Sequence, residues 1–351
     1  MSTSLLHTPL RAGALALRNR IVMAPLTRCR CSPGRVPNDL MATYYRQRAA
    51  AGMILSEATS VDPMGVGYPD TPGIWSDEQV VGWQKVTGAV HQEGGLILLQ
   101  LWHVGRISDS SYLHGAQPVA PSAIAAKGHV SLLRPEKAYE VPRALALEEL
   151  PGVIAGYRRG AELAQRAGFD GVEIHGANGY LLDQFLQDST NHRNDAYGGP
   201  VENRARLMLE AVDAAIAVWG ADRVGLHLSP RGDAHDMGDS DAAGTFGYVA
   251  REAGRRGLAF ICAREHHLAP ALGPQLKEQF GGVFIANEQF TRESAAAAIA
   301  AGQADAVAWG QAFIANPDLP RRFLEGAALN EPKPQSYYGQ GPEGYTDYPA
   351  L

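Results

Sequence analysis

The sequence lacks the features that mark secreted, membrane and nucleic-acid-binding proteins. Cysteine occurs only 3 times in 351 residues, which excludes a disulfide framework and favours a reducing compartment. No window approaches the roughly 18 apolar residues of a membrane span. The first residues also lack the basic segment and apolar run of a signal peptide. The net charge of −6 argues against nucleic acid or a membrane as partner. We therefore expect a cytoplasmic protein, a monomer or a homodimer, that acts on a small molecule.

Several enzyme motifs are missing as well. No G-x-G-x-x-G follows the first apolar segment, so an open dinucleotide-binding sheet is not indicated. Cys29 and Cys31 are too close in the chain for the usual zinc spacing, and the adjacent His266 and His267 fit a surface loop. The strand ends also lack the paired carboxylates of glycoside hydrolysis. We therefore predict no metal site, and expect a cofactor that brings its own reactivity.

Short apolar runs alternate with amphipathic segments along most of the chain. The apolar runs are continuous, which is typical of strands buried on both faces. Strands are predicted near 20–25, 53–58, 96–102, 171–175, 224–229, 259–262, 282–286 and 306–310. Helices are predicted over 39–51, 77–93, 148–167, 201–219, 242–256, 270–279, 291–301 and 318–326. This alternation predicts an α/β fold, a (β/α)8 TIM barrel, as a single domain over residues 1–351.

Two segments interrupt the alternation. Residues 103–147 form a long insert after the third predicted strand and contain four prolines. A connection of this length inside a barrel is usually functional, and we expect it to act as a lid. Residues 330–351 are rich in Gly, Pro and Tyr, so this tail is expected to be non-helical and to pack over a barrel end or against a neighbouring subunit.

One short stretch carries most of the candidate chemistry. His175 ends the fourth predicted strand, and Asn178 and Tyr180 follow in a turn that contains Gly176 and Gly179. A histidine and a carboxamide can both hydrogen-bond one ligand oxygen, and a tyrosine can supply a proton. In TIM barrels the active site lies at the C-terminal ends of the strands. The other predicted strand ends contribute Pro25, Leu26, Thr27, Ala58, Gln100, Trp102, His227, Ala286, Asn287, Gly310 and Gln311.

Blocks along nearly the whole chain resemble the old yellow enzyme family of FMN-dependent ene-reductases, in particular its bacterial xenobiotic-reductase-like branch. The matching blocks begin at Arg18, Tyr44, Leu55, Gln100, His175, Tyr197, Phe313 and Glu343, in the order the family has them. The resemblance implies FMN as cofactor and NAD(P)H as reductant. It also implies reduction of activated alkenes such as enones, enals, maleimides and nitroalkenes.

The resemblance also implies a role for each candidate residue. Tyr180 would protonate the alkene carbon opposite the one that receives hydride from flavin N5, while His175 and Asn178 would hold the substrate's carbonyl or nitro oxygen. Pro25, Leu26, Thr27, Ala58, Gln100, Ala286, Asn287 and Gly310 would contact the cofactor. Tyr68, Trp102 and Tyr338 would shape the substrate end of the pocket, although Trp102 fits core packing equally well.

Two positions depart from the family pattern. His227 stands where the family has an arginine beside the flavin, and Gln311 stands where it has an arginine or lysine for the phosphate. Each charge-assisted bond is worth roughly 1.5–3 kcal/mol, so their loss predicts weakly bound FMN. The alternative is a family member that has lost flavin function and performs flavin-independent acid–base chemistry on carbonyl compounds, or only binds them.

Overall fold

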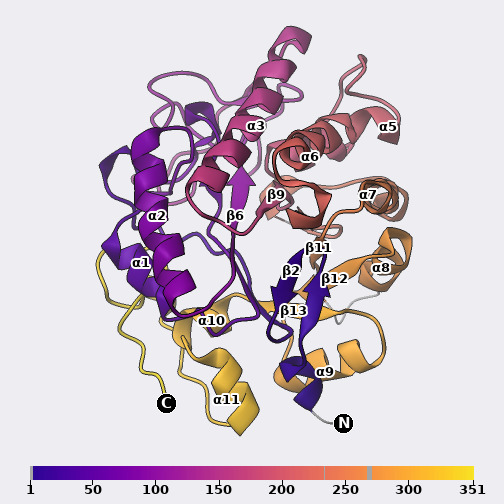
Figure 1. The fold of residues 1–351 in the computed structure, drawn as a ribbon. Coiled ribbons are helices and arrows are strands. Elements are labelled where there is room, and N and C mark those ends of the chain that lie inside the picture. Colours follow the sequence, from indigo (N-terminus) through magenta and orange to yellow (C-terminus); the bar gives the residue numbers. More distant parts are fainter. Residues whose placement is uncertain (1–2, 233, 267–270) are drawn as a thin grey trace.

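A computed structural model describes residues 3–232, 234–266 and 271–351. Parallel strands form a closed barrel at its centre (Figure 1). Each strand pairs with its neighbours in the order β3-β4-β6-β9-β10-β11-β12-β13, and a β13–β3 pairing closes the ring. The barrel strands are β3 (Ile21–Met23), β4 (Met53–Leu55), β6 (Ile97–Trp102), β9 (Val172–Gly176), β10 (Val224–Leu228), β11 (Phe260–Arg264), β12 (Val283–Asn287) and β13 (Ala306–Trp309). The predicted TIM barrel is confirmed, and every predicted strand is present.

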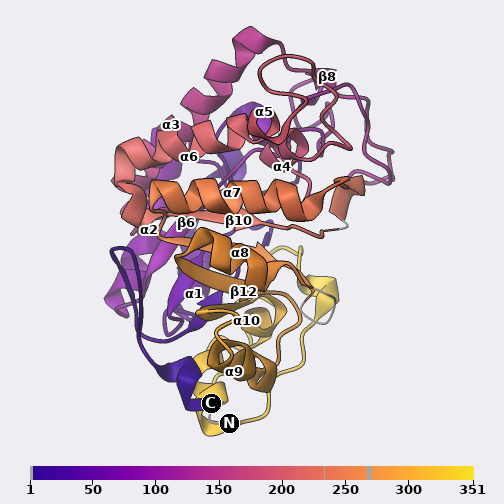
Figure 2. The ribbon, with the colours of Figure 1, turned by 90° about the vertical axis from the view of Figure 1, so that its right-hand side faces the viewer.

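Helices cover the outside of the barrel. In Figure 2, α7 and α8 run side by side over β10 and β12. The helices are α1 (Asp39–Arg46), α2 (Asp77–Gln92), α3 (Leu150–Arg166), α4 (Leu181–Leu186), α5 (Val201–Arg204), α6 (Arg206–Trp219), α7 (Ala242–Arg256), α8 (Gly273–Phe280), α9 (Arg292–Ala300), α10 (Gln311–Ala315) and α11 (Leu319–Glu325). Local signals set several ends. Ser76 and Gln79 form a capping box at the start of α2, and Gly257 ends α7 in the left-handed conformation.

The structure differs from the predicted elements in several places. The helix predicted over 201–219 is divided into α5 and α6 at Ala205. The helix predicted from Pro270 begins at Gly273, with Pro274 in its first turn, where proline is well tolerated. Pro270 and His267 lie outside the described residues. The strands and α-helices outside the predicted ranges are β1 (Leu10–Ala12), β2 (Leu15–Leu17), β5 (Thr59–Ser60), β7 (Val119–Ala120), β8 (Arg143–Ala144) and the short helices α4 and α10.

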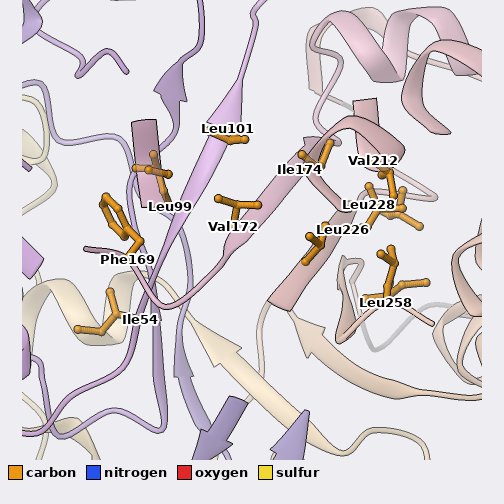
Figure 3. Close-up of a cluster of buried hydrophobic side chains, with 14 of the residues drawn as sticks. Ile54, Leu99, Leu101, Phe169, Val172, Ile174, Val212, Leu226, Leu228 and Leu258 are labelled. Carbon is orange, nitrogen blue, oxygen red and sulfur yellow. The ribbon is translucent and has the colours of Figure 1, made fainter. Parts of the chain in front are cut away.

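The barrel strands are buried on both faces, and successive side chains alternate between them. One set packs against the helices, as Figure 3 shows for side chains from β6, β9 and β10. The other set fills the barrel interior and includes Met53, Leu98, Phe260 and Cys262. Between Val172 and Ile174 in β9, Glu173 therefore faces the interior, and His175 follows it on the same face. The period of 2 thus delivers polar side chains to the mouth of the barrel.

The insert and the tail both pack against the barrel. In the insert, Ala126, Val130 and Tyr139 pack in one apolar cluster with Tyr68 and Trp102. In the tail, the Tyr345 ring stacks on Tyr44 with centroids 4.0 Å apart. The guanidinium of Arg28 donates to the Gly344 carbonyl at 2.7 Å. The tail has no α-helix within its residues, as predicted. No helix in the described part of the chain combines the length and apolar character needed to cross a bilayer.

Candidate active site

A cavity of about 110 Å³ lies at the C-terminal ends of the barrel strands. Its lining consists of Pro25, Thr27, Ala58, Gln100, Trp102, His175, Asn178, Tyr180, His227 and Arg264. All but Arg264 were among the predicted site residues. These side chains come from different strands, so closure of the barrel brings them together.

His175 lies at the end of β9 and is buried, with 4% of its surface exposed. Its Nδ1 accepts a hydrogen bond from the backbone N–H of Ala177 at 3.3 Å. Burial, together with His227, His235 and Arg264 nearby, holds the pKa of His175 well below its ordinary value. The imidazole is therefore neutral at physiological pH. Because Nδ1 is the acceptor, Nε2 carries the proton and can donate to a ligand oxygen.

Asn178 adopts a positive φ of 57° in the turn after β9. Its side-chain Oδ1 accepts a hydrogen bond from Nη1 of Arg264 at 2.9 Å. Its backbone N–H donates to Oγ of Ser229 at 2.6 Å. With Oδ1 engaged by the arginine, the Nδ2 amide is the group left to donate toward the cavity. Arg264 therefore orients the carboxamide, a contact between residues that lie 86 positions apart.

Tyr180 follows the same turn and is hydrogen-bonded to Tyr68, with 2.8 Å between the hydroxyl oxygens. Burial raises the pKa of Tyr180 above its ordinary value, so the phenol stays protonated at neutral pH. Its ring meets those of His175 and Trp102 edge to face, at centroid distances of 5.1 and 4.9 Å. The three polar groups of the short predicted loop thus converge on one cavity.

The predicted substrate-side residues are placed differently from one another. Trp102 lines the cavity, and Tyr68 stacks against it at 5.5 Å between ring centroids. Tyr338 in the tail is half-exposed and does not line the cavity. His235, which the sequence did not indicate, packs near the Tyr180 ring at 5.1 Å and bonds the Asn178 carbonyl through Nδ1 at 2.6 Å.

A polar network buried in the barrel lies beneath the cavity. Nε2 of Gln100 donates to Oε2 of Glu173 at 2.7 Å. His227 Nδ1 lies 3.2 Å from the other carboxylate oxygen of Glu173. Glu173, His227 and Cys262 hold their ligand atoms within 4.8 Å of one another, the spacing of a possible metal site. Both carboxylate oxygens already have polar partners, the Gln100 amide on Oε2 and the His227 imidazole on Oε1. Glu173 was missed in the sequence, although its alternation with Val172 and Ile174 was the signal for it.

The other predicted cofactor residues lie outside this cavity. Ala286 and Asn287, at the end of β12, line a separate cavity of about 440 Å³ between β11, β12, α8 and α9. The Asn287 amide is bonded to the Ala308 carbonyl at 2.7 Å. Gly310 and Gln311 begin α10, and the side chain of Leu26 lies against Gly310.

An ion pair that the sequence did not predict stands between these two regions. Nη2 of Arg264 lies 3.1 Å from Oε1 of Glu288, in the loop after β12. Arg264 thus contacts Asn178 at the cavity lining and Glu288 in the loop after β12. Glu288 and the following Gln289 both have positive φ, 95° and 59°, which is uncommon for residues with side chains.

Comparison with known proteins places the chain in a family. The sequence pattern of the NADH:flavin oxidoreductase / NADH oxidase family matches residues 5–330. The chain is 44% identical to 12-oxophytodienoate reductase 1 of Oryza sativa subsp. japonica, over 99% of this chain and 93% of that protein. It is 42% identical to a probable flavin mononucleotide-dependent alkene reductase of Leishmania infantum, over 100% of this chain and 98% of that protein.

Solved structures agree with this placement. An old yellow enzyme homologue from Zymomonas mobilis superposes with a TM-score of 0.96 at 47% identity, over 99% of both chains. Morphinone reductase in complex with tetrahydroNAD superposes with a TM-score of 0.95 at 48% identity, over 99% of this chain and 97% of that chain.

Proposed function

This chain belongs to the NADH:flavin oxidoreductase / NADH oxidase family, and on that premise we propose that it is an ene-reductase for activated C=C bonds. It is an FMN-dependent oxidoreductase of the old yellow enzyme type, with a reduced nicotinamide as its reductant. The substrates we propose are enones, enals, maleimides and nitroalkenes, because each carries an oxygen that His175 and Asn178 can hold.

The donor and acceptor groups of the cavity fit the heteroatom edge of a flavin ring. Gln100 bonds Glu173 through its Nε2, which leaves its Oε1 for a ligand. His227 bonds Glu173 through its Nδ1, which leaves its Nε2 for a ligand. Thr27 adds a hydroxyl to the same lining. The ring carries carbonyl oxygens and an N–H, so a mixture of donors and acceptors is what it requires. Pro25 and Ala58 provide apolar contact. The residues at the mouth would therefore hold the flavin by its ring.

The mechanism follows from the states of the three loop residues. FMN, when bound and reduced, supplies the hydride. His175 Nε2 and Asn178 Nδ2 donate to the substrate oxygen and stabilise the negative charge that builds on it. Tyr180, kept protonated by burial, gives its proton to the other alkene carbon. Its hydrogen bond to Tyr68 orients the phenol, and the aromatic walls exclude water.

The convergence of His175, Asn178 and Tyr180 on one cavity carries this proposal. The alternative, flavin-independent acid–base chemistry, is not favoured, because the chain matches a flavin oxidoreductase family over residues 5–330 and a flavin mononucleotide-dependent relative over its full length. The His175 imidazole and the Tyr180 phenol are also both neutral, so neither is a strong base at physiological pH.

Replacing Tyr180 with phenylalanine tests the proton-donor role. We expect Tyr180→Phe to slow alkene reduction by about 10²–10⁴-fold, the usual contribution of general acid catalysis. Reduction of the bound flavin by NADPH should continue near the wild-type rate, because that half-reaction needs no proton from the phenol. Stopped-flow measurement of the two half-reactions separates them. If both rates fall together, Tyr180 is not the proton donor. Tyr338→Phe, in the half-exposed tail, is the matched control.

A further inference from the structure

The corner where TIM barrels bind phosphate has an unusual charge balance in this chain. Such sites form from the loops after the seventh and eighth strands and the start of a short extra helix. In this chain the seventh strand is β12 and the eighth is β13. The short helix that follows β13 is α10. Residues 287–291 read Asn-Glu-Gln-Phe-Thr, and residues 310–314 read Gly-Gln-Ala-Phe-Ile. The only ionised side chain in these two segments is the Glu288 carboxylate.

Three arginines near this corner, in the described part of the chain, are already paired with carboxylates. Arg264 is paired with Glu288 and also bonds Asn178. Arg231, after β10, lies 3.8 Å from Glu265, and Arg292 lies 2.8 Å from Glu293. A phosphate entering the corner would therefore meet no excess positive charge from these residues. It would also have to compete with Glu288 for the guanidinium of Arg264.

Hydrogen bonds to β13 hold the loop that carries Glu288 beside Arg264. Nδ2 of Asn287 donates to the Ala308 carbonyl at 2.7 Å, and Nε1 of Trp309 donates to the Phe290 carbonyl at 2.8 Å. Both bonds tie the loop to β13 on either side of Glu288. The positive φ of residues 288 and 289 suits glycine, which would leave room for a phosphate against the backbone. This chain instead places a carboxylate and a carboxamide there.

We propose that this protein binds its flavin through the ring system and gains little from the 5′-phosphate, because Glu288 neutralises Arg264. This inference rests on the proposed flavin-dependent function. The ligands of the site are then flavins that carry the 5′-phosphate, such as FMN, and flavins that lack it, such as riboflavin. Riboflavin should then bind nearly as tightly as FMN, and Glu288 is the residue that sets this lack of discrimination.

Flavin binding to the full chain tests this directly, without any measurement of activity. Apoprotein is titrated into FMN and into riboflavin, and the quenching of flavin fluorescence gives the two dissociation constants. For the wild type we expect them to differ by less than about tenfold. In Glu288→Gln, Arg264 loses its carboxylate partner and can make a charge-assisted bond to the phosphate, so FMN should bind at least about tenfold more tightly. The riboflavin constant should change much less, and the gain for FMN should shrink at high salt.

Two further variants make the result specific. Glu293→Gln removes one negative charge at the start of the neighbouring helix α9, and should shift the FMN-to-riboflavin ratio by less than about twofold because of screening. Glu288→Gly removes the charge together with the strained φ, and should behave as Glu288→Gln does. Wild-type protein that binds FMN more than about tenfold tighter than riboflavin would overturn the inference, as would an unchanged ratio in both Glu288 variants. If neither flavin bound to any variant, the proposed function itself would fail.

Discussion

His103 and His175, near the barrel mouth, are buried and kept neutral by their surroundings. His103, after β6, is 4% exposed, and its Nδ1 accepts a hydrogen bond from the Gly105 backbone N–H at 3.1 Å. Burial lowers its pKa from 6.5 to about 4. His175 is shifted in the same direction. A neutral imidazole can accept on one nitrogen and donate on the other, and the role proposed for His175 uses both properties.

This burial predicts a pH dependence of stability. Between pH 6.5 and about 4 the unfolded chain holds a proton on His103 that the folded protein does not. The free energy of unfolding should therefore fall by about 1.4 kcal/mol for each pH unit as the pH drops through this range. His103→Gln should reduce the slope by that amount, as measured by urea unfolding at several pH values. The exposed His192→Gln serves as control. An unchanged slope in His103→Gln would show that His103 is not the group responsible.

At the scale of elements, the tail packs against the outside of the barrel next to β3. Arg28 and Arg30, which follow β3, donate to tail carbonyls, including those of Gly344 and Gly341 at 2.7 and 2.9 Å. Tyr345 is fully buried against Tyr44. The sequence allowed two places for the tail, a barrel end or a neighbouring subunit, and here it docks on its own chain. Its position next to β3 means that it buttresses the strand end that carries Pro25 and Thr27.

Removal of the Tyr345 ring should undock the tail. Tyr345→Ala leaves a cavity beside Tyr44 and should lower the free energy of unfolding by about 3–5 kcal/mol. Limited proteolysis should then cut within residues 330–351 at a protease concentration that leaves the wild type intact. Tyr338→Ala removes the same ring from a half-exposed position and should cost much less. Equal protease resistance of wild type and Tyr345→Ala would contradict this account of tail docking.

At the scale of the whole molecule, the buried side chains of the barrel interior pack closely against one another. Gly225 in β10 faces Phe260 of β11, and a Cβ atom added at Gly225 would lie 2.1 Å from the Phe260 ring. Phe260 is itself fully buried, so its ring has no solvent-filled space to move into. The lack of a side chain at this one position lets a large ring occupy the barrel core.

A single added methyl group at Gly225 should therefore disturb the entire barrel. We expect Gly225→Ala to lower the free energy of unfolding by about 1–3 kcal/mol through overpacking. Gly88→Ala in α2 meets nothing within 4 Å and should be neutral, or stabilising by up to about 1 kcal/mol, because alanine favours helices. Thermal and urea unfolding of the two variants provide the comparison. Equal stability of the two would mean that the Phe260 ring relaxes without cost.

The sequence by itself determined the barrel and the three polar residues that converge on the cavity. Continuous apolar strands and amphipathic helices are local patterns, because burial on two faces or on one stripe fixes which residues recur at which spacing. His175, Asn178 and Tyr180 were identifiable for a related reason. They lie on one strand end and its turn, so the chain itself holds them together.

Tertiary structure alone decided how those groups are oriented and what surrounds them. The contact of Arg264 with Asn178, the ion pair with Glu288 and the hydrogen bond between Tyr68 and Tyr180 all join residues from separate strand ends. No periodicity encodes such pairs, because they depend on which strands lie beside each other once the barrel has closed. The short helix α10 was missed for a different reason: one turn of helix is too short to show a period of 3.6. The charge at the phosphate corner is likewise a property of the folded barrel, since it results from loops that meet only there.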